Sequence, residues 1–486
     1  MPRYSRREFL RNTALMAMVP AVGLRASEAP KPPARSPNIV YVFADQMRAC
    51  ARGGAAGADP VLTPRLDQFA REGLELTQAA STYPLCSPHR AMLLSGCYPH
   101  VNTVTGNINS APNRKFELPD TMTCVTDVLA GSGYSVGYIG KWHLTRPYEP
   151  YLEAFRKKNG VVWNEFTPPS GRHGISEWYA YNTYDKHLRP MYWSNDASRD
   201  DYHFVDQWGP DHETDKAVEY LRTHQASDQP FALFVSYNPP HPPFGEVPEN
   251  WVDLYRDASA TELLTRGNVP EGGRLPLRQA QGYFGMVSGV DAAFGRLLDE
   301  IDALGLREDT LVVFTSDHGE MMGSHDLMSK LVWYDESYRV PFIARWPGRL
   351  KTGAQDSLLI DTPDIPATLV GMAGLENRIP AHWQGRNHAP VLLGQSDAPR
   401  PEAQLYCLNS HGVRGVRTDR YTFVAPGRAR TKVGGQVMDA PLLFDNQEDP
   451  WQLRNVAAEQ PAVADELMGL TQDACRRIRD PWTPFV

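Results

Sequence analysis

A cysteine, a proline and an arginine stand at alternate positions in the first fifth of the chain, as Cys86, Pro88 and Arg90. Proline fits the first turn of a helix, where its missing N–H costs nothing, so this spacing predicts a helix that begins near Cys86. The free N–H groups and the macrodipole of such a helix start favour an anion, and Arg90 lies one turn further on, facing the same way. The pattern suits chemistry on an anionic group. The alternative is a cysteine that packs in the core.

Two aspartates follow long apolar runs, Asp45 after Asn38–Ala44 and Asp317 after Thr310–Ser316. Such runs predict buried strands of a parallel sheet. Ligands of open α/β sheets bind outside the carboxyl ends of the strands, which is where both carboxylates would lie. Carboxylate oxygens suit a hard cation such as Ca²⁺ or Mg²⁺. Taken singly, each aspartate is also explained as a cap or turn residue.

Basic side chains follow two further strand-like segments. Lys141 and His143 lie two apart on a chain expected to be extended, so both are expected to point to one face. His241 stands between prolines in residues 239–243, after the apolar run Phe231–Tyr237, and is therefore held at a strand end. A lysine there can bind an anionic oxygen, and a histidine can transfer a proton. Exposed polar residues and a plain proline-rich loop are the alternatives.

Together these motifs resemble the formylglycine-dependent sulfatases of the alkaline phosphatase superfamily, over nearly all of residues 37–460. In that family a maturation enzyme oxidises the cysteine of a Cys-x-Pro-x-Arg motif to an aldehyde, whose hydrate attacks sulfur. Residues 133–143 resemble the second sulfatase signature, and residues 316–320 resemble a metal-binding segment. The resemblance implies a sulfuric ester hydrolase that uses the formylglycine made from Cys86, with a covalent sulfo-enzyme from which sulfate is later eliminated.

The resemblance also implies a role for each matching residue. One divalent metal, for which it favours Ca²⁺ while Mn²⁺ and Mg²⁺ suit the same donor types, would be held by Asp45, Gln46, Cys86, Asp317 and His318. The implied catalytic residues are Cys86, Arg90, Lys141, His143, His241 and Lys330, with Asn107 near the ester. In this scheme His241 protonates the departing alcohol, His143 takes a proton from the hydrate and later expels sulfate, and the cations neutralise the sulfuryl oxygens.

Four positions depart from the family pattern: Gln46 replaces an aspartate, His318 an asparagine, His89 a small residue and Ser95 a threonine. Gln46 also resembles the related phosphonate monoester hydrolases. A phosphonate or phosphate monoester or diester hydrolase is therefore one alternative function, and a non-catalytic binder of sulfated glycans is another. The core motif required for oxidation is intact, so we expect Cys86 to be converted.

Strand-like runs alternate with amphipathic segments, which predicts an α/β fold with a large mixed, mainly parallel sheet flanked by helices. Helices are expected at residues 63–73, 120–130, 211–224 with Asp211 as the cap, and 277–304. Beyond about residue 395, short strand-like runs between turn residues predict a smaller antiparallel sheet, followed by a helical tail at 461–479. We thus expect a catalytic domain at 38–395 and a C-terminal α+β subdomain at 396–486.

The N-terminus predicts an export signal at residues 1–29, followed by a proline-rich linker at 30–37. Arg6 and Arg7 precede an apolar stretch, Ala14–Leu24, that is too short to span a bilayer. The pair resembles the bacterial twin-arginine signal. We therefore expect the twin-arginine export machinery and a formylglycine-generating enzyme as partners, a periplasmic or secreted location, and no membrane span in the mature chain.

Composition narrows the class of partner. The net charge of −8 argues against a nucleic acid, and six scattered cysteines without a CxxC pair form neither a zinc motif nor a disulfide scaffold. The expected substrate is a small-molecule or glycan sulfate ester. A sulfated carbohydrate is our hypothesis, because residues 148–208 are rich in aromatic side chains that can stack on sugars; packing on the domain surface is the alternative.

Overall fold

The computed structural model describes residues 36–484, apart from 114, 158, 274, 396, 409–411, 428–430 and 434–435. The expected export signal and most of the linker lie outside this part of the chain. Within the described residues, no helix is long and apolar enough to cross a membrane.

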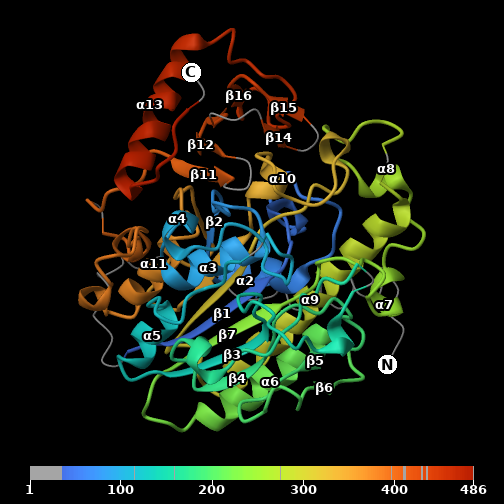
Figure 1. Cartoon of the computed structure of the whole chain (residues 1–486), viewed down its shortest axis with the longest axis vertical. Coiled ribbons are helices and arrows are strands. Elements are labelled where there is room, and N and C mark those ends of the chain that lie inside the picture. Colours follow the sequence, from blue (N-terminus) through green and yellow to red (C-terminus); the bar gives the residue numbers. More distant parts are fainter. Residues whose placement is uncertain are drawn as a thin grey trace, which may run out of the picture.

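A mixed sheet of eight strands forms the centre of the molecule (Figure 1). In spatial order its strands are β10 (Ala354–Asp356), β2 (Leu74–Leu76), β9 (Phe342–Arg345), β8 (Thr310–Ser316), β1 (Asn38–Ala44), β7 (Phe231–Tyr237), β3 (Ser135–Lys141) and β4 (Glu177–Tyr181). The five strands from β8 to β4 run parallel, while β9 is antiparallel to both of its neighbours. The predicted fold class is confirmed, and the three apolar runs form β1, β7 and β8 with the expected bounds.

Helices cover both faces of this sheet, which explains why β1 is buried at every position from Ile39 to Ala44. Ile39, Tyr41 and Phe43 belong to a core shared with α3 (Cys86–Ser95), α5 (Val125–Ala130) and α11 (Asp364–Met372). Val40, Val42 and Ala44 point the other way, into a core shared with α2 (Pro64–Glu72), α6 (Gly209–His224) and α9 (Leu277–Ala303). The site must therefore open at the ends of the strands, because neither face is free.

Two helix starts differ from the predicted ones. The helix expected from residue 120 begins only at Val125. The backbone N–H of Cys124 donates to the Asp127 carboxylate, as part of a capping box at this helix start. Helix α6 begins two residues before Asp211, so this aspartate lies in the first turn and is not the cap. A carboxylate in the first turn still complements the helix dipole. Helices α2 and α9 match the expected segments within one residue at each end.

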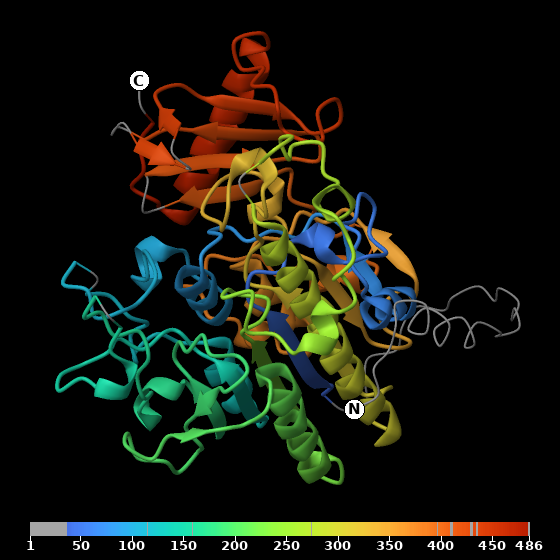
Figure 2. The same cartoon turned by 90° about the vertical axis from the view of Figure 1, so that its right-hand side faces the viewer.

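A second sheet of four antiparallel strands lies at one end of the molecule, with a long helix packed on it (Figure 2). Its strands, in order, are β11 (Gln404–Leu408), β12 (Val413–Arg417), β13 (Tyr421–Ala425) and β16 (Leu442–Asp445), and the helix is α13 (Pro461–Ile478). The smaller antiparallel sheet and the helical tail are confirmed. The domain boundary near residue 395 stays a prediction.

Short elements complete the described chain. The paired strands are β5 (Met191–Tyr192) with β6 (His203–Phe204), and β14 (Thr431–Val433) with β15 (Gln436–Met438). The short helices are α4 (Pro99–Asn102), α7 (Glu249–Val252), α8 (Ala260–Leu263), α10 (Asp335–Tyr338) and α12 (Ala389–Leu392). Single 3₁₀ turns lie at Ala49–Ala51, Glu153–Phe155, Pro169–Arg172, Ser324–Asp326 and Glu376–Arg378.

The core between the sheet and α9 carries much of the stability, and a pair of leucine variants tests this. Leu297 of α9 has no exposed surface, so Leu297→Ala is expected to lower the free energy of unfolding by about 2–5 kcal/mol through the cavity it leaves. Leu453 is 61% exposed, and Leu453→Ala is expected to change it by no more than about 0.5 kcal/mol. Urea unfolding followed by circular dichroism measures both. Equal shifts in the two variants would contradict this account of the core.

Candidate active site

Four adjacent parallel strands, β8, β1, β7 and β3, deliver polar side chains to one edge of the sheet. Ala44, the last residue of β1, pairs with Ser316 of β8 and with Tyr237 of β7. The following residues, Asp45, Asp317 and Asn238, therefore leave the sheet at the same level. All three are buried. The edge at which the sequence predicts the site is the edge at which these residues meet.

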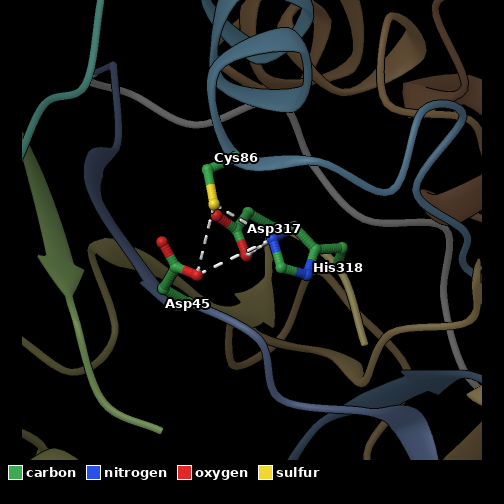
Figure 3. Close-up of side chains that lie close together, drawn as sticks. All are labelled: Asp45, Cys86, Asp317 and His318. Carbon is green, nitrogen blue, oxygen red and sulfur yellow. Dashed lines mark hydrogen bonds and ion pairs between the residues drawn. The ribbon is translucent and has the colours of Figure 1, made fainter. Parts of the chain in front are cut away.

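Cys86 is the first residue of α3, and its thiol points into this group of strand ends (Figure 3). Its Sγ lies 3.3 Å from His318 Nε2 and 3.7 Å from an oxygen of Asp45. The candidate ligand atoms of Cys86, Asp45, Asp317 and His318 all lie within 4.8 Å of one another. Burial, and next Asp45, raise the pKa of the thiol to about 11, so the unmodified thiol is protonated at neutral pH.

The imidazole of His318 directs its Nε2 toward the thiol of Cys86. Its Nδ1 is 3.0 Å from the carbonyl oxygen of Gly319, which only accepts hydrogen bonds, so Nδ1 carries the proton. Burial, and next Lys330, hold the pKa of His318 well below its usual range and keep the ring neutral. The lone pair of Nε2 therefore faces Cys86 and the carboxylates, which is the tautomer that a metal ligand needs.

Arg90 neutralises much of the negative charge of this group. Its Nη2 lies 3.1 Å from Asp45 Oδ2 and 3.2 Å from Asp317 Oδ2. The other nitrogen, Nη1, donates to the carbonyl oxygen of Lys141 at 2.6 Å and to Ser236 Oγ at 2.7 Å. One guanidinium thus connects helix α3 with four strand ends. The expected position of Arg90, one turn beyond Cys86 and on the same side of the helix, is the one observed.

Lys141, the last residue of β3, points its ammonium into the site. The Nζ lies 2.6 Å from Asp45 Oδ2 and 3.0 Å from Asn238 Oδ1. The preceding residue must be glycine, because Gly140 has a φ of +101° and a Cβ there would lie 2.2 Å from the carbonyl oxygen of Ser236. This close approach of β3 to β7 positions Lys141 over Asp45.

The two carboxylates differ in charge state. Burial favours the neutral form of Asp45, but Lys141, followed by His241 and Arg90, outweighs it and holds the pKa of Asp45 well below its usual range. Burial, and next the charge of Asp45, raise the pKa of Asp317 to about 7 in spite of Arg90 and Lys141. Asp317 is therefore only partly ionised near neutral pH, and a bound cation would favour its charged form. A cation among Asp45, Asp317, His318 and residue 86 suits this arrangement of donors.

Gln46 and Lys330 lie beside this group and bind each other. The ammonium of Lys330 donates to Gln46 Oε1, and Gln46 Nε2 donates to the carboxylate of Glu320. The backbone N–H of Gln46 donates to Asp317 Oδ1 at 3.0 Å. Gln46 has a φ of +75°, which turns the chain directly after β1. The amide of Gln46 is thus engaged by Lys330 and Glu320 in this structure.

The segment around His143 is not extended, in contrast to the expectation. His143 has a φ of +59°, so the chain turns directly after β3. Its Nε2 donates to the carbonyl oxygen of Ile108 at 3.2 Å, and its buried Nδ1 has no partner among the described residues. Burial, and next Lys141, hold its pKa well below the usual range, which leaves a neutral ring with a free acceptor nitrogen.

His241 lies at the opposite wall of the site, after β7. Its Nδ1 donates to the carbonyl oxygen of Pro242 at 2.8 Å and lies 3.5 Å from a carboxylate oxygen of Asp185. The exchangeable nitrogen is therefore Nε2. Burial, followed by Lys141 and Lys330, holds the pKa of His241 well below its usual range. A bound anion between these cations would raise it.

Asn107 and His89 flank the start of α3. Asn107 Oδ1 accepts from the backbone N–H of Ser87 at 3.1 Å, so the residue lies next to Cys86. The Nδ1 of His89 lies 3.0 Å from Ser81 Oγ and 3.2 Å from Thr362 Oγ1. Burial, and next Arg90, lower its pKa to about 3. The histidine at position 89 is thus accommodated by two hydroxyl partners.

Several aromatic side chains of residues 148–208 pack inside the protein. Trp178, Trp193, Trp208 and Tyr192 are all at most 4% exposed, so for these four the packing alternative holds. Trp163 is half-buried, and its ring centre lies 6.0 Å from that of His143. Trp163 is thus an aromatic residue of this segment that lies next to a predicted site residue.

Sequence reasoning gave no role to several residues that position the site. Asn238 and Ser236 bind Lys141 and Arg90, and Glu320 binds Gln46. Asn238 precedes the prolines around His241, so a polar residue directly after a buried strand was the available signal. Asp185, near His241, belongs to a segment without a recognisable motif, and only the tertiary structure brings it there.

Comparisons with known proteins agree with this geometry. The sequence matches the sulfatase family over residues 37–375 and the family described as N-sulphoglucosamine sulphohydrolase, C-terminal, over residues 323–475. It is 37% identical to an endo-4-O-sulfatase of Bacteroides thetaiotaomicron, over 96% of this chain and 97% of that protein. It is 34% identical to an ulvan-active sulfatase of Formosa agariphila, over 86% of this chain and 77% of that protein.

A solved structure extends the likeness to three dimensions. The crystal structure of a sulfatase-assigned protein from Bacteroides fragilis superposes with a TM-score of 0.85 at 38% identity, over 94% of this chain and 98% of that one. The two family matches together span the main sheet, the C-terminal sheet and the motif around Cys86. The chain belongs to the sulfatase family of the alkaline phosphatase superfamily and is a sulfatase-type enzyme.

Proposed function

We propose that this enzyme hydrolyses sulfate esters of carbohydrates, with the oxidised form of Cys86 as the nucleophile and one divalent cation beside it. The observation that carries the proposal is the convergence of Cys86, Asp45, Asp317 and His318 within 4.8 Å at the start of α3. The family uses a metal and a formylglycine, and this chain has a cysteine where the second is made and an acidic group where the first would bind.

Asp45, Asp317, His318 and residue 86 would hold the metal, and calcium suits the two carboxylates. When bound, the metal supplies positive charge that polarises the sulfuryl group, and the aldehyde hydrate supplies a nucleophile that the protonated thiol of Cys86 does not. Gln46 can become a metal ligand only if its amide oxygen gives up the hydrogen bond from Lys330.

The cations of the chain bind and orient the ester. Lys141 and Arg90 lie on the Asp45 side of Cys86 and Lys330 lies on the Gln46 side, so negative charge that grows on the sulfuryl oxygens is met from two directions. These groups are held by hydrogen bonds before substrate binds, and little reorganisation is needed. Asn107, which binds the backbone N–H of Ser87 beside Cys86, would contact the ester.

The two histidines have opposite tasks in the proposed reaction. His143 offers an unprotonated Nδ1 and acts as the base toward the hydroxyl of residue 86. His241 acts as the acid toward the departing alcohol through Nε2, because its Nδ1 proton is committed to Pro242. The negative charge of the bound ester offsets Lys141 and Lys330, which raises the pKa of His241 when an acid is required.

A sulfated carbohydrate is the proposed substrate class, because the two relatives described above are named for 4-O-sulfate removal and for ulvan. A phosphonate or phosphate ester hydrolase is the competing function, and the observation that favours it is Gln46 in place of a second aspartate. Export through the twin-arginine route and oxidation of Cys86 by a maturation enzyme remain part of the proposal.

Peptide mass spectrometry and substrate comparison test the nucleophile and the ester. The tryptic peptide that ends at Arg90 is expected to be about 18 Da lighter than its cysteine form, since an aldehyde replaces the thiol. The next peptide, with Cys97, is the internal control. Purified enzyme is expected to hydrolyse 4-nitrophenyl sulfate faster than 4-nitrophenyl phenylphosphonate. A full-mass Cys86 peptide in active enzyme, or faster phosphonate turnover, would contradict the proposal.

Thermal unfolding with and without calcium tests the metal site. Saturating Ca²⁺ at about 100 times its Kd is expected to add about 2.7 kcal/mol of stability, because it binds the folded state alone. Asp317→Asn is expected to abolish this shift. Asp291→Asn is the matched control, since Asp291 is equally buried but bonds the N–H groups of α2. An unchanged calcium shift in Asp317→Asn would rule out the site.

His241→Ala tests the proposed acid. We expect kcat/KM for an alkyl sulfate, whose alcohol must be protonated, to fall by about 10²–10⁴-fold. The loss for 4-nitrophenyl sulfate should be much smaller, because nitrophenolate leaves without a proton. His203→Ala, at an exposed histidine of β6, should leave both rates near wild type. Equal losses on the two esters would show that His241 is not the acid.

A further inference from the structure

A cavity of about 560 Å³ opens beside the groups that would face the departing alcohol. Its wall includes Gln46, which binds Lys330, and Ser329, which precedes Lys330 in the chain. It also includes Pro242 and Pro243, which follow His241. The cavity therefore adjoins the leaving-group side of the proposed reaction centre, where the remainder of a substrate must lie.

The wall of this cavity is mainly apolar. Pro242, Pro243, Phe244, Pro276 and Met328 all line it. Met328 is 39% exposed, so its side chain is available for contact with a bound molecule. Rigid apolar surfaces of this kind suit the C–H face of a sugar ring. A second cavity of about 510 Å³ shares Phe244, Gly245 and Arg278 with the first, so the groove continues away from Cys86.

Arg278 stands where the two cavities meet, and it is exposed. Within the described part of the chain no ion pair or hydrogen bond of its guanidinium is found, whereas the nearby Arg256 binds Glu249 and Asp253. It is also the second residue of α9, at the helix end where the dipole disfavours a cation. Neither pairing nor helix stability accounts for an arginine here.

We propose that this groove binds the sugar unit that adjoins the sulfated one, and that Arg278 binds an anionic group on that unit. The inference rests on the proposed function. The anionic group is a carboxylate or a second sulfate, since a guanidinium binds either oxyanion through paired N–H groups. Arg278 is thus a specificity residue for acidic glycans, and it does not act in the sulfate-transfer chemistry.

Kinetics of Arg278→Ala on large and small substrates test the inference. The substrates are a chondroitin 4-sulfate hexasaccharide, its carboxyl-reduced form, a sulfated carrageenan hexasaccharide with a neutral backbone, and 4-nitrophenyl sulfate. We expect kcat/KM to fall about tenfold, mainly through KM, on a glycan that the wild type hydrolyses. The rate on 4-nitrophenyl sulfate should not change. Arg278→Lys should retain part of the wild-type kcat/KM on that glycan. Gln279→Ala, at an exposed neighbour in the same wall, should retain all of it.

The outcomes separate the two proposals. A loss that disappears on the carboxyl-reduced glycan assigns a carboxylate, and a loss that persists there or occurs with carrageenan assigns a sulfate. Equal kcat/KM for wild type and Arg278→Ala on every hydrolysed glycan overturns the inference, as does an equal loss on 4-nitrophenyl sulfate. Wild type that hydrolyses 4-nitrophenyl sulfate but no glycan also overturns it. Wild type that hydrolyses no sulfate ester overturns the proposed function itself.

Discussion

The guanidinium of Arg90 lies between two carboxylates that are fully removed from water, and the rest of the site is arranged around this contact. Asp45 and Asp317 repel each other at short range in a medium of low dielectric, so neither position is stable without a fixed cation. Removing one partner of such a buried pair typically costs about 3–5 kcal/mol. Because Arg90 belongs to α3, the same contact also fixes the start of that helix, and with it Cys86, over the ends of β1 and β8.

Backbone geometry does the remaining positioning. Parallel strands that end at one level can deliver side chains from distant parts of the sequence, and here β8, β1, β7 and β3 do so without any long loop. The turns directly after the strands need uncommon conformations, as the positive φ of Gln46 and of His143 shows. Strain at these residues is tolerated because the strands before them are buried on both faces.

Much of the scaffold could be predicted from local sequence patterns. The apolar runs gave β1, β7 and β8, and the proline at position 88 placed the helix start at Cys86. The start of α5, the turn at His143 and the amide partners of Gln46 could not be predicted, because each depends on contacts between segments far apart in the chain. Asp185 reaches His241 from an irregular segment that carries no periodicity. Patterns of apolar residues thus predict the scaffold and the strand-end residues, while orientations within the site are set by tertiary packing.

The complete burial of Cys86 limits when the oxidation that we propose for it can take place. No atom of this residue is accessible once α3 lies on the sheet, so any enzyme that converts the thiol must reach residues 86–90 while the chain is still unfolded there. Folding and conversion then compete for the same molecules. A variant that folds faster would accumulate as stable protein with a lower fraction of converted sites, and its specific activity would fall although its active-site residues were unchanged.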